Sequence, residues 1–259
     1  MSMVMAELKI EDLFCGYGRE DIVKGVSVTV RAGEILSVAG PNGCGKTTLL
    51  RAAAGLLPIR SGAVYLDGVS ISEMSHKERA KRIALLSQTG TGGDYFDYTV
   101  YETVSMGRYP HREGIFSEAS EEDEKAVRRC IAETGLTGLE NESLTRLSGG
   151  QLQRVFLARA FAQEPDVLFL DEPANHLDVK YVSELIALLE KWTAAGRSVI
   201  GVFHDPGLAA AVSDRIMLMD KGQAVLCGSP AEVLKSEKMN EVFETDIGAY
   251  MQKITEIWK

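Results

Sequence analysis

Hydrophobic residues gather in short runs that each end at a polar motif. The runs cover residues 35–39, 83–86, 167–170 and 199–203. Continuous apolar runs of this length predict strands that are buried on both faces of a parallel sheet. Ligand sites in such sheets lie at the carboxyl ends of the strands. We therefore expect the polar motifs that follow the four runs to converge on one site.

Helical patterns alternate with these runs. Residues 179–195 place apolar side chains on one face, and residues 121–134 begin after a serine with four acidic residues in the first turn. Both patterns are typical of amphipathic helices. Two later runs, 215–219 and 224–227, predict a hairpin around a Lys-Gly turn. Strands that alternate with helices indicate an α/β fold.

Composition excludes several classes of protein. The chain has 259 residues, with 28 Lys+Arg against 37 Asp+Glu, which gives a net charge of −9. That acidic balance argues against nucleic acid as a partner. The longest stretches without charge, 35–45 and 83–93, fall short of the roughly 20 residues that span a bilayer. With no secretory signal and no paired cysteines, we expect a cytoplasmic chain with reduced thiols.

A glycine-rich motif follows the first apolar run and matches G-x-x-x-x-G-K-[ST]. Its residues are Gly40, Pro41, Asn42, Gly43, Cys44, Gly45, Lys46 and Thr47. Glycines let backbone N–H groups approach phosphates, Lys46 adds positive charge, and the Thr47 hydroxyl is a Mg²⁺ ligand. A helix predicted over 48–54, from Thr48 onward, points its positive end at the same anions. The motif predicts a nucleotide site but leaves kinase, GTPase and motor open.

Two further motifs narrow the class. Asp171 and Glu172 follow the third apolar run, where Asp171 is expected to hold Mg²⁺ and Glu172 to take a proton from the attacking water. A Ser-Gly-Gly-Gln turn opens another helix and forms a second anion-binding helix end. Its residues are Ser148, Gly149, Gly150 and Gln151. Because one chain needs one γ-phosphate cradle, two cradles predict a head-to-tail dimer.

Taken together, these motifs resemble those of ATP-binding cassette (ABC) ATPases over nearly the whole chain. In order they are an A-loop aromatic (Tyr17), Walker A (40–47), a Q-loop (Gln88), the signature (147–151), Walker B (167–172), a D-loop (176–178) and a switch histidine (His204). The resemblance implies a RecA-like P-loop NTPase core with an antiparallel β edge and an inserted α-helical subdomain. The expected core covers 1–88 and 162–228, the subdomain 89–161 and a helical tail 229–259.

The family also implies residue roles and the ligands ATP and Mg²⁺. Tyr17 stacks on adenine, Gln88 and His204 sense the γ-phosphate and water, Gln88 also binds Mg²⁺, and Asp178 contacts the second protomer. Beside these roles, a thiol at Cys44 lies next to a helix N-terminus and a lysine, which predicts a lowered pKa and a reactive cysteine. The alternative is that Cys44 fills a position that needs a small residue and that its sulfur is shielded.

The kind of ABC protein follows from what the chain lacks. One cassette without membrane helices or long heptads excludes a fused exporter, a two-cassette factor and a chromosome-type ATPase. Residues 99–104, 107–111 and 171–178 resemble ATPases of importers for iron–siderophore, haem and cobalamin, although the family most often has Thr at Ala174. We expect a homodimer on an integral membrane permease, contacted through residues 89–111, on the inner face of the membrane. An extracytoplasmic substrate-binding protein would act indirectly. The alternative is a soluble ABC ATPase that acts on a protein or metallocluster assembly partner.

Overall fold

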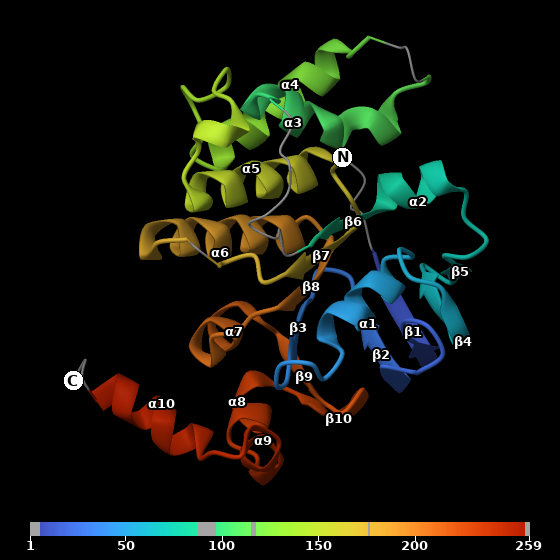
Figure 1. The fold of residues 1–259 in the computed structure, drawn as a ribbon, viewed down its shortest axis with the longest axis vertical. Coiled ribbons are helices and arrows are strands. Elements are labelled where there is room, and N and C mark those ends of the chain that lie inside the picture. Colours follow the sequence, from blue (N-terminus) through green and yellow to red (C-terminus); the bar gives the residue numbers. More distant parts are fainter. Residues whose placement is uncertain (1–5, 88–96, 115–117, 176, 257–259) are drawn as a thin grey trace.

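The computed structural model describes residues 6–87, 97–114, 118–175 and 177–256 (Figure 1). Two sheets form its centre. The first is antiparallel, in the order β2 (Val23–Val30), β1 (Leu8–Cys15), β4 (Ile59–Leu66) and β5 (Val69–Ser70). The second has the order β10 (Gln223–Gly228), β9 (Arg215–Asp220), β3 (Ile35–Ala39), β8 (Ser198–Val202), β7 (Val167–Asp171) and β6 (Ile83–Leu86).

In the second sheet the strands from β9 to β6 are parallel, and only the β9–β10 hairpin is antiparallel. The strands β3 and β6 have the bounds that the apolar runs predict. The fourth run is displaced by one residue, because β8 begins at Ser198, whose buried hydroxyl donates to the Arg31 carbonyl at 2.9 Å. The hairpin around Lys221 is confirmed.

Both faces of the six-stranded sheet are covered, which explains why its strands are apolar throughout. On β7, Leu168 and Leu170 enter one core cluster, while Val167 and Phe169 enter the other. The first cluster packs against helices of the chain's middle and end, and the second against the antiparallel sheet and α1. The P-loop fold with an antiparallel edge and inserted helices is confirmed.

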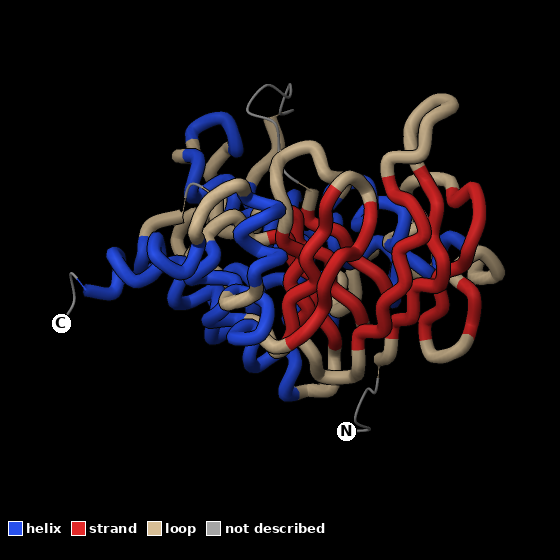
Figure 2. Tube along the Cα trace, turned by 90° about the horizontal axis from the view of Figure 1, so that it is seen from below, coloured by secondary structure: helices blue, strands red, loops and turns tan. Residues whose placement is uncertain are grey.

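The helices lie mostly on one side of the strands (Figure 2). They are α1 (Lys46–Ala53), α2 (His76–Arg82), α3 (Val100–Ser105), α4 (Glu121–Glu133), α5 (Gly149–Ala162), α6 (Val179–Ala194), α7 (Pro206–Val212), α8 (Pro230–Leu234), α9 (Glu237–Phe243) and α10 (Ile247–Glu256), with 3-10 turns η1 (Met106–His111) and η2 (Leu144–Arg146). Between β6 and β7 the chain forms α3, α4 and α5, which pack together. Within the described ranges, no helix has the length and hydropathy of a membrane span. The domain boundaries given above stay predictions.

An ion network centred on the buried Arg108 joins η1, α4 and the turn between α5 and β7. Arg108 donates to Asp123 at 2.8 Å and to Glu164 at 2.7 Å, and Arg129 donates to Glu164 at 2.6 Å. Burial by itself raises the pKa of Asp123, but the bonds from Arg108 and Ser120 lower it to about 2. The acidic first turn of α4 is therefore solvated at Glu121, Glu122 and Glu124 only, since Asp123 is buried.

Candidate active site

The glycine-rich loop connects β3 to α1 and is shaped by left-handed backbone. Gly40 has φ +146°, and a Cβ there would lie 2.3 Å from the Met219 carbonyl oxygen. Gly45 has φ +107° and precedes α1 without a side-chain cap. The first N–H groups of α1 thus have no side-chain acceptor at the cap, at the carboxyl end of a buried strand. Such groups are suited to hold phosphate oxygens.

Lys46 is buried beneath this loop and turns back onto it. Its Nζ donates to the carbonyl of Gly40 at 2.7 Å and to that of Pro41 at 3.0 Å. Within the part of the chain that the structure describes, no carboxylate pairs with this ammonium group. Its positive charge is therefore available to an anion in the loop. Thr48, two residues after Lys46, is buried on the side of α1 that faces the core.

Asp171 and Thr47 meet at the end of β7. Asp171 is only 2% exposed. Burial raises the pKa of Asp171, and its interaction with the Thr47 side chain opposes that rise. Oδ1 of Asp171 is buried without a hydrogen-bond partner among the described residues. A carboxylate oxygen left free beside a hydroxyl fits Mg²⁺, which prefers oxygen ligands. Gln88 lies outside the described residues, so its metal and sensor roles stay predictions.

Glu172 and His204 are in direct contact. Oε1 of Glu172 pairs with Nε2 of His204, and Oε2 accepts a hydrogen bond from Asn175. Glu172 has φ +57°, a left-handed conformation that is uncommon outside glycine and that gathers at functional sites. Its N–H donates to the Val202 carbonyl at 3.1 Å, which fixes the end of β7 against the end of β8.

A cavity of about 270 Å³ opens beside this pair. It is lined by residues that include Glu172, Asn175, His204 and Leu208. The two motifs after the third and fourth apolar runs therefore converge, as the strand-end argument predicts. Asn175 was not among the predicted site residues. Its position three residues after Glu172, in the turn before α6, is the signal that could have identified it.

The Ser-Gly-Gly-Gln turn forms the N-terminus of α5 and carries a capping box. The N–H of Gln151 donates to Ser148 Oγ at 3.3 Å, and the N–H of Ser148 donates to Gln151 Oε1 at 2.8 Å. Ser148 and Gly149 are exposed, while Gly150 and Gln151 are half-buried. In Figure 1, α5 lies with the upper helices and α1 with the lower sheets. The two predicted cradles are thus separate features of one chain.

Asp178 and Tyr17, which are predicted to contact the second protomer and the adenine, are both exposed. Asp178 caps α6, where its Oδ1 accepts the Tyr181 N–H at 3.1 Å. Tyr17 is 48% exposed in the turn between β1 and β2, and its hydroxyl accepts a hydrogen bond from Arg51 at 3.1 Å. The D-loop residue His176 lies outside the described residues. The partner contact of Asp178 and the adenine contact of Tyr17 stay predictions.

The expectation of a reactive thiol at Cys44 is wrong. Cys44 is 5% exposed, and burial raises the pKa of its thiol, while Lys46 opposes that rise only in part. The sequence places a cation and a helix end beside the sulfur, which by themselves favour a thiolate. What it does not show is the packing of Cys44 into the core cluster that holds α1.

Four aromatic residues of the segment predicted to face a permease are the interface candidates, Tyr95, Phe96, Tyr98 and Tyr101. Tyr98 is exposed, Tyr101 packs against the core cluster, and Tyr95 and Phe96 lie outside the described residues. Tyr109 of the same segment is also exposed.

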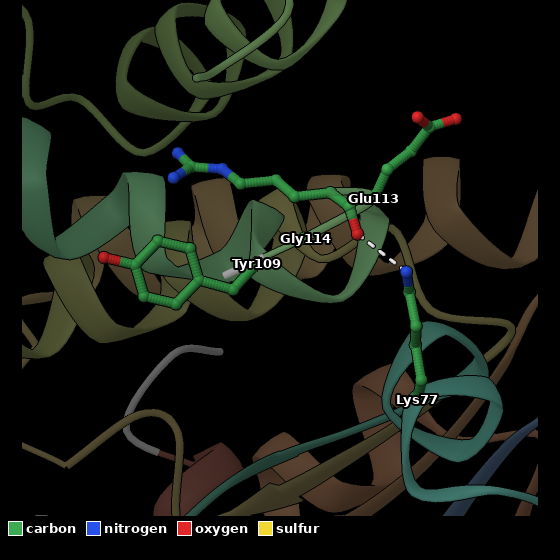
Figure 3. A pocket seen from close by; sticks show the side chains of 5 residues that line it. Lys77, Tyr109, Glu113 and Gly114 are labelled. Carbon is green, nitrogen blue, oxygen red and sulfur yellow. Dashed lines mark hydrogen bonds between the residues drawn. The ribbon is translucent and has the colours of Figure 1, made fainter. Parts of the chain in front are cut away.

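A cavity of about 470 Å³ lies between α2 and the end of η1, where the guanidinium of Arg112 stands 4.7 Å from the centre of the Tyr109 ring. Lys77 reaches from α2 and donates to the Arg112 carbonyl at 2.7 Å (Figure 3). Lys77 and Arg112 were not predicted, because they come together only through the packing of α2.

Comparison with known proteins agrees with this geometry. A family model described as "ABC transporter" matches residues 23–175. The chain is 39% identical to YvrA of Bacillus subtilis, an uncharacterized ABC transporter ATP-binding protein, over 95% of the chain, but it spans only 55% of that relative. It is 37% identical to the iron(3+)-hydroxamate import ATP-binding protein FhuC of Bacillus subtilis, over 93% of the chain and 89% of FhuC.

A solved structure is similar along almost the whole chain. It is cbiO1 from Clostridium perfringens, described as part of the ABC transporter complex cbiONQ. The match has a TM-score of 0.75 and 30% sequence identity, and it covers 95% of this chain and 98% of that one.

Proposed function

The chain belongs to the ABC transporter ATP-binding family, whose members are ATPases, and we propose that it is the ATP-hydrolysing subunit of an importer. In this proposal two copies dimerise head-to-tail on an integral membrane permease and drive the uptake of a metal chelate. The single observation that carries the ATPase part is the cluster of Lys46, Thr47, Asp171, Glu172 and His204 at the ends of three adjacent strands, β3, β8 and β7.

Each residue has a distinct task in this proposal. Lys46 and the α1 N–H groups bind the phosphates, and Thr47 with Asp171 would hold Mg²⁺. The metal, when bound, neutralises charge on the phosphate oxygens. Glu172 accepts a proton from the attacking water. His204 and Asn175 hold the two carboxylate oxygens of Glu172, so that its orientation is set before the substrate arrives.

The head-to-tail dimer is proposed because, among the described residues, only the capping box of α5 itself occupies the second helix end. Ser148 and Gly149 are exposed, and the cap of α5 leaves the hydroxyl at the surface. A second copy that presents this turn to the P-loop would complete the site and exclude water from it. Oligomers with shared sites are most simply built with two-fold symmetry.

The proposed permease partner and the proposed cargo class are supported by different observations. Tyr98 and Tyr109 are exposed, and Tyr109 lines a cavity; both are suited to contact a protein partner, since aromatic residues are enriched at interface hot spots. The cargo class rests on the similarity to FhuC, whose name states iron(3+)-hydroxamate import, and on the residues at 99–111 and 171–178. The cytoplasmic face of the membrane is the location that this partner requires.

Co-purification from membranes tests the proposal. We expect a tagged chain, extracted with mild detergent from its own host, to carry an integral membrane protein with it. Tyr109→Ala would weaken this co-purification, whereas the matched control Val69→Ala, an exposed apolar residue on β5, would not. Recovery of the chain with a protein or metallocluster assembly factor and no membrane protein would contradict the importer and favour the soluble alternative.

A further inference from the structure

The turn that carries Tyr17 is a compact loop, residues 16–22, between β1 and β2. The Ile22 N–H donates to the Cys15 carbonyl at 2.9 Å and closes it. Inside the loop the chain is tight, because a Cβ on Gly16 would lie 2.1 Å from the Glu20 carbonyl oxygen. Tyr17 leaves this loop with nearly half of its surface exposed.

One arginine from the neighbouring strand donates hydrogen bonds to three acceptors in the loop. Arg60, the second residue of β4, donates through Nη1 to the Arg19 carbonyl at 3.0 Å and to the Asp21 carboxylate at 2.6 Å. Its Nη2 donates to the Gly18 carbonyl at 2.9 Å. Two of the three acceptors are thus main-chain groups that follow Tyr17 directly in the sequence.

The ring of Tyr17 is therefore constrained at both ends. Arg60 holds the backbone just after it, and Arg51 of α1 donates to its hydroxyl at 3.1 Å. Since α1 begins at Lys46, the second bond sets the ring relative to the phosphate loop. We propose that Arg60 is a positioning residue for nucleotide base binding, which holds the 16–22 loop so that Tyr17 presents its ring to the base. This inference rests on the proposed stacking role of Tyr17.

Two physical arguments favour this role over a contribution to stability alone. The pair of Arg60 and Asp21 is partly exposed, with side-chain exposures of 31% and 35%, and ion pairs in such places stabilise a fold little. A planar guanidinium that spans three acceptors instead fixes their relative geometry. A loop ordered before the ligand arrives does not lose that conformational entropy on binding, so the effect appears in affinity for the base.

The experiment compares two ligands that share phosphates and differ in the base. The affinities of MgATP and of magnesium tripolyphosphate are measured by competition with a fluorescent ATP analogue. Tyr17→Ala removes the stacking face and is expected to weaken ATP by roughly 5- to 100-fold. Arg60→Ala is expected to weaken ATP by roughly 3- to 10-fold, because a charged donor to two loop carbonyls is lost. Both variants leave tripolyphosphate affinity unchanged, and the double variant binds ATP no more weakly than Tyr17→Ala.

The matched control is Lys9→Ala, which breaks an exposed pair with Glu11 on β1 of the same sheet and leaves both ligands unaffected. Equal loss of ATP and tripolyphosphate in Arg60→Ala would show that Arg60 supports the fold and not the base contact. Loss in Tyr17→Ala with none in Arg60→Ala would overturn the positioning role alone. No loss in Tyr17→Ala would overturn the stacking role and the inference with it.

Discussion

The two helix N-termini that the sequence predicts to bind anions, those of α1 and α5, are built in opposite ways. The start of α1 is buried, has no side-chain cap, and follows a loop whose own carbonyls hold the Lys46 ammonium. The start of α5 is exposed and carries a capping box, in which Ser148 and Gln151 satisfy each other's N–H groups. Both ends offer positive dipole to an anion.

The difference shows that the two ends have different relations to the nucleotide. The α1 end is a cradle within one chain, with Asp171 Oδ1 left unpaired beside it among the described residues. The α5 end carries a capping box, and its residues Ser148 and Gly149 are exposed to solvent. A nucleotide reaches such a terminus when a second molecule presents it. In the proposed dimer, the P-loop of the second copy presents that nucleotide.

Glu172→Gln has the largest expected effect. A glutamine keeps the size of the side chain but does not accept the proton, so turnover falls by about 10²- to 10⁴-fold while MgATP still binds. The ATP-bound dimer then accumulates, and size-exclusion chromatography with ATP shows it. The control is Glu190→Gln, an exposed glutamate of α6. Normal turnover in Glu172→Gln would contradict the assignment of the base.

Two substitutions, Lys46→Ala and Ser148→Arg, distinguish the roles of the α1 and α5 N-termini within a single chain. Lys46→Ala removes the charge under the phosphates and is expected to weaken ATP binding by roughly 10- to 100-fold. Ser148→Arg blocks only the outer end, so ATP affinity at concentrations where the chain is monomeric stays within about twofold of wild type. Equal weakening by both substitutions, measured by titration, would mean that one chain uses both ends on the same ATP.

Asp171→Asn has a smaller effect, on stability. Burial raises the folded-state pKa of Asp171 above its usual 3.8, so the ionised carboxylate destabilises the fold at neutral pH. Removing that charge is expected to raise Tm, because a buried charge without full pairing destabilises the fold. The gain is full above the folded pKa and shrinks as pH falls toward 3.8. A gain that does not change with pH would contradict this cause.

Much of the fold and of the site could be predicted from local sequence. Apolar runs identify β3 and β6 to the residue and β7 and β8 to within one residue, because polar residues interrupt the runs close to the strand ends. The contact of Glu172 with His204 follows from two adjacent parallel strands that end at the same edge of the sheet.

The rest depends on contacts between residues that are distant in the sequence. Arg108 can be buried because two carboxylates accept hydrogen bonds from its guanidinium group. They belong to Asp123 and Glu164, which lie 15 and 56 residues away in the sequence. Cys44 has a raised thiol pKa because the core closes over it, although its sequence neighbours predict the reverse. Arg60 reaches a loop that precedes it by about 40 residues, through the pairing of β4 with β1. None of these partners leaves a periodic signal that a single sequence displays.

The most direct test of the account mixes two inactive chains. Lys46→Ala has a damaged cradle and an intact outer helix end, and Ser148→Arg has the reverse. Random pairing makes about one quarter of the composite sites intact, so the mixture is expected to hydrolyse ATP at up to about that fraction of the wild-type rate. Each parent alone stays near zero. A mixture no more active than its parents, or a parent that keeps full activity by itself, would contradict the claim that the two ends close on one ATP from two copies.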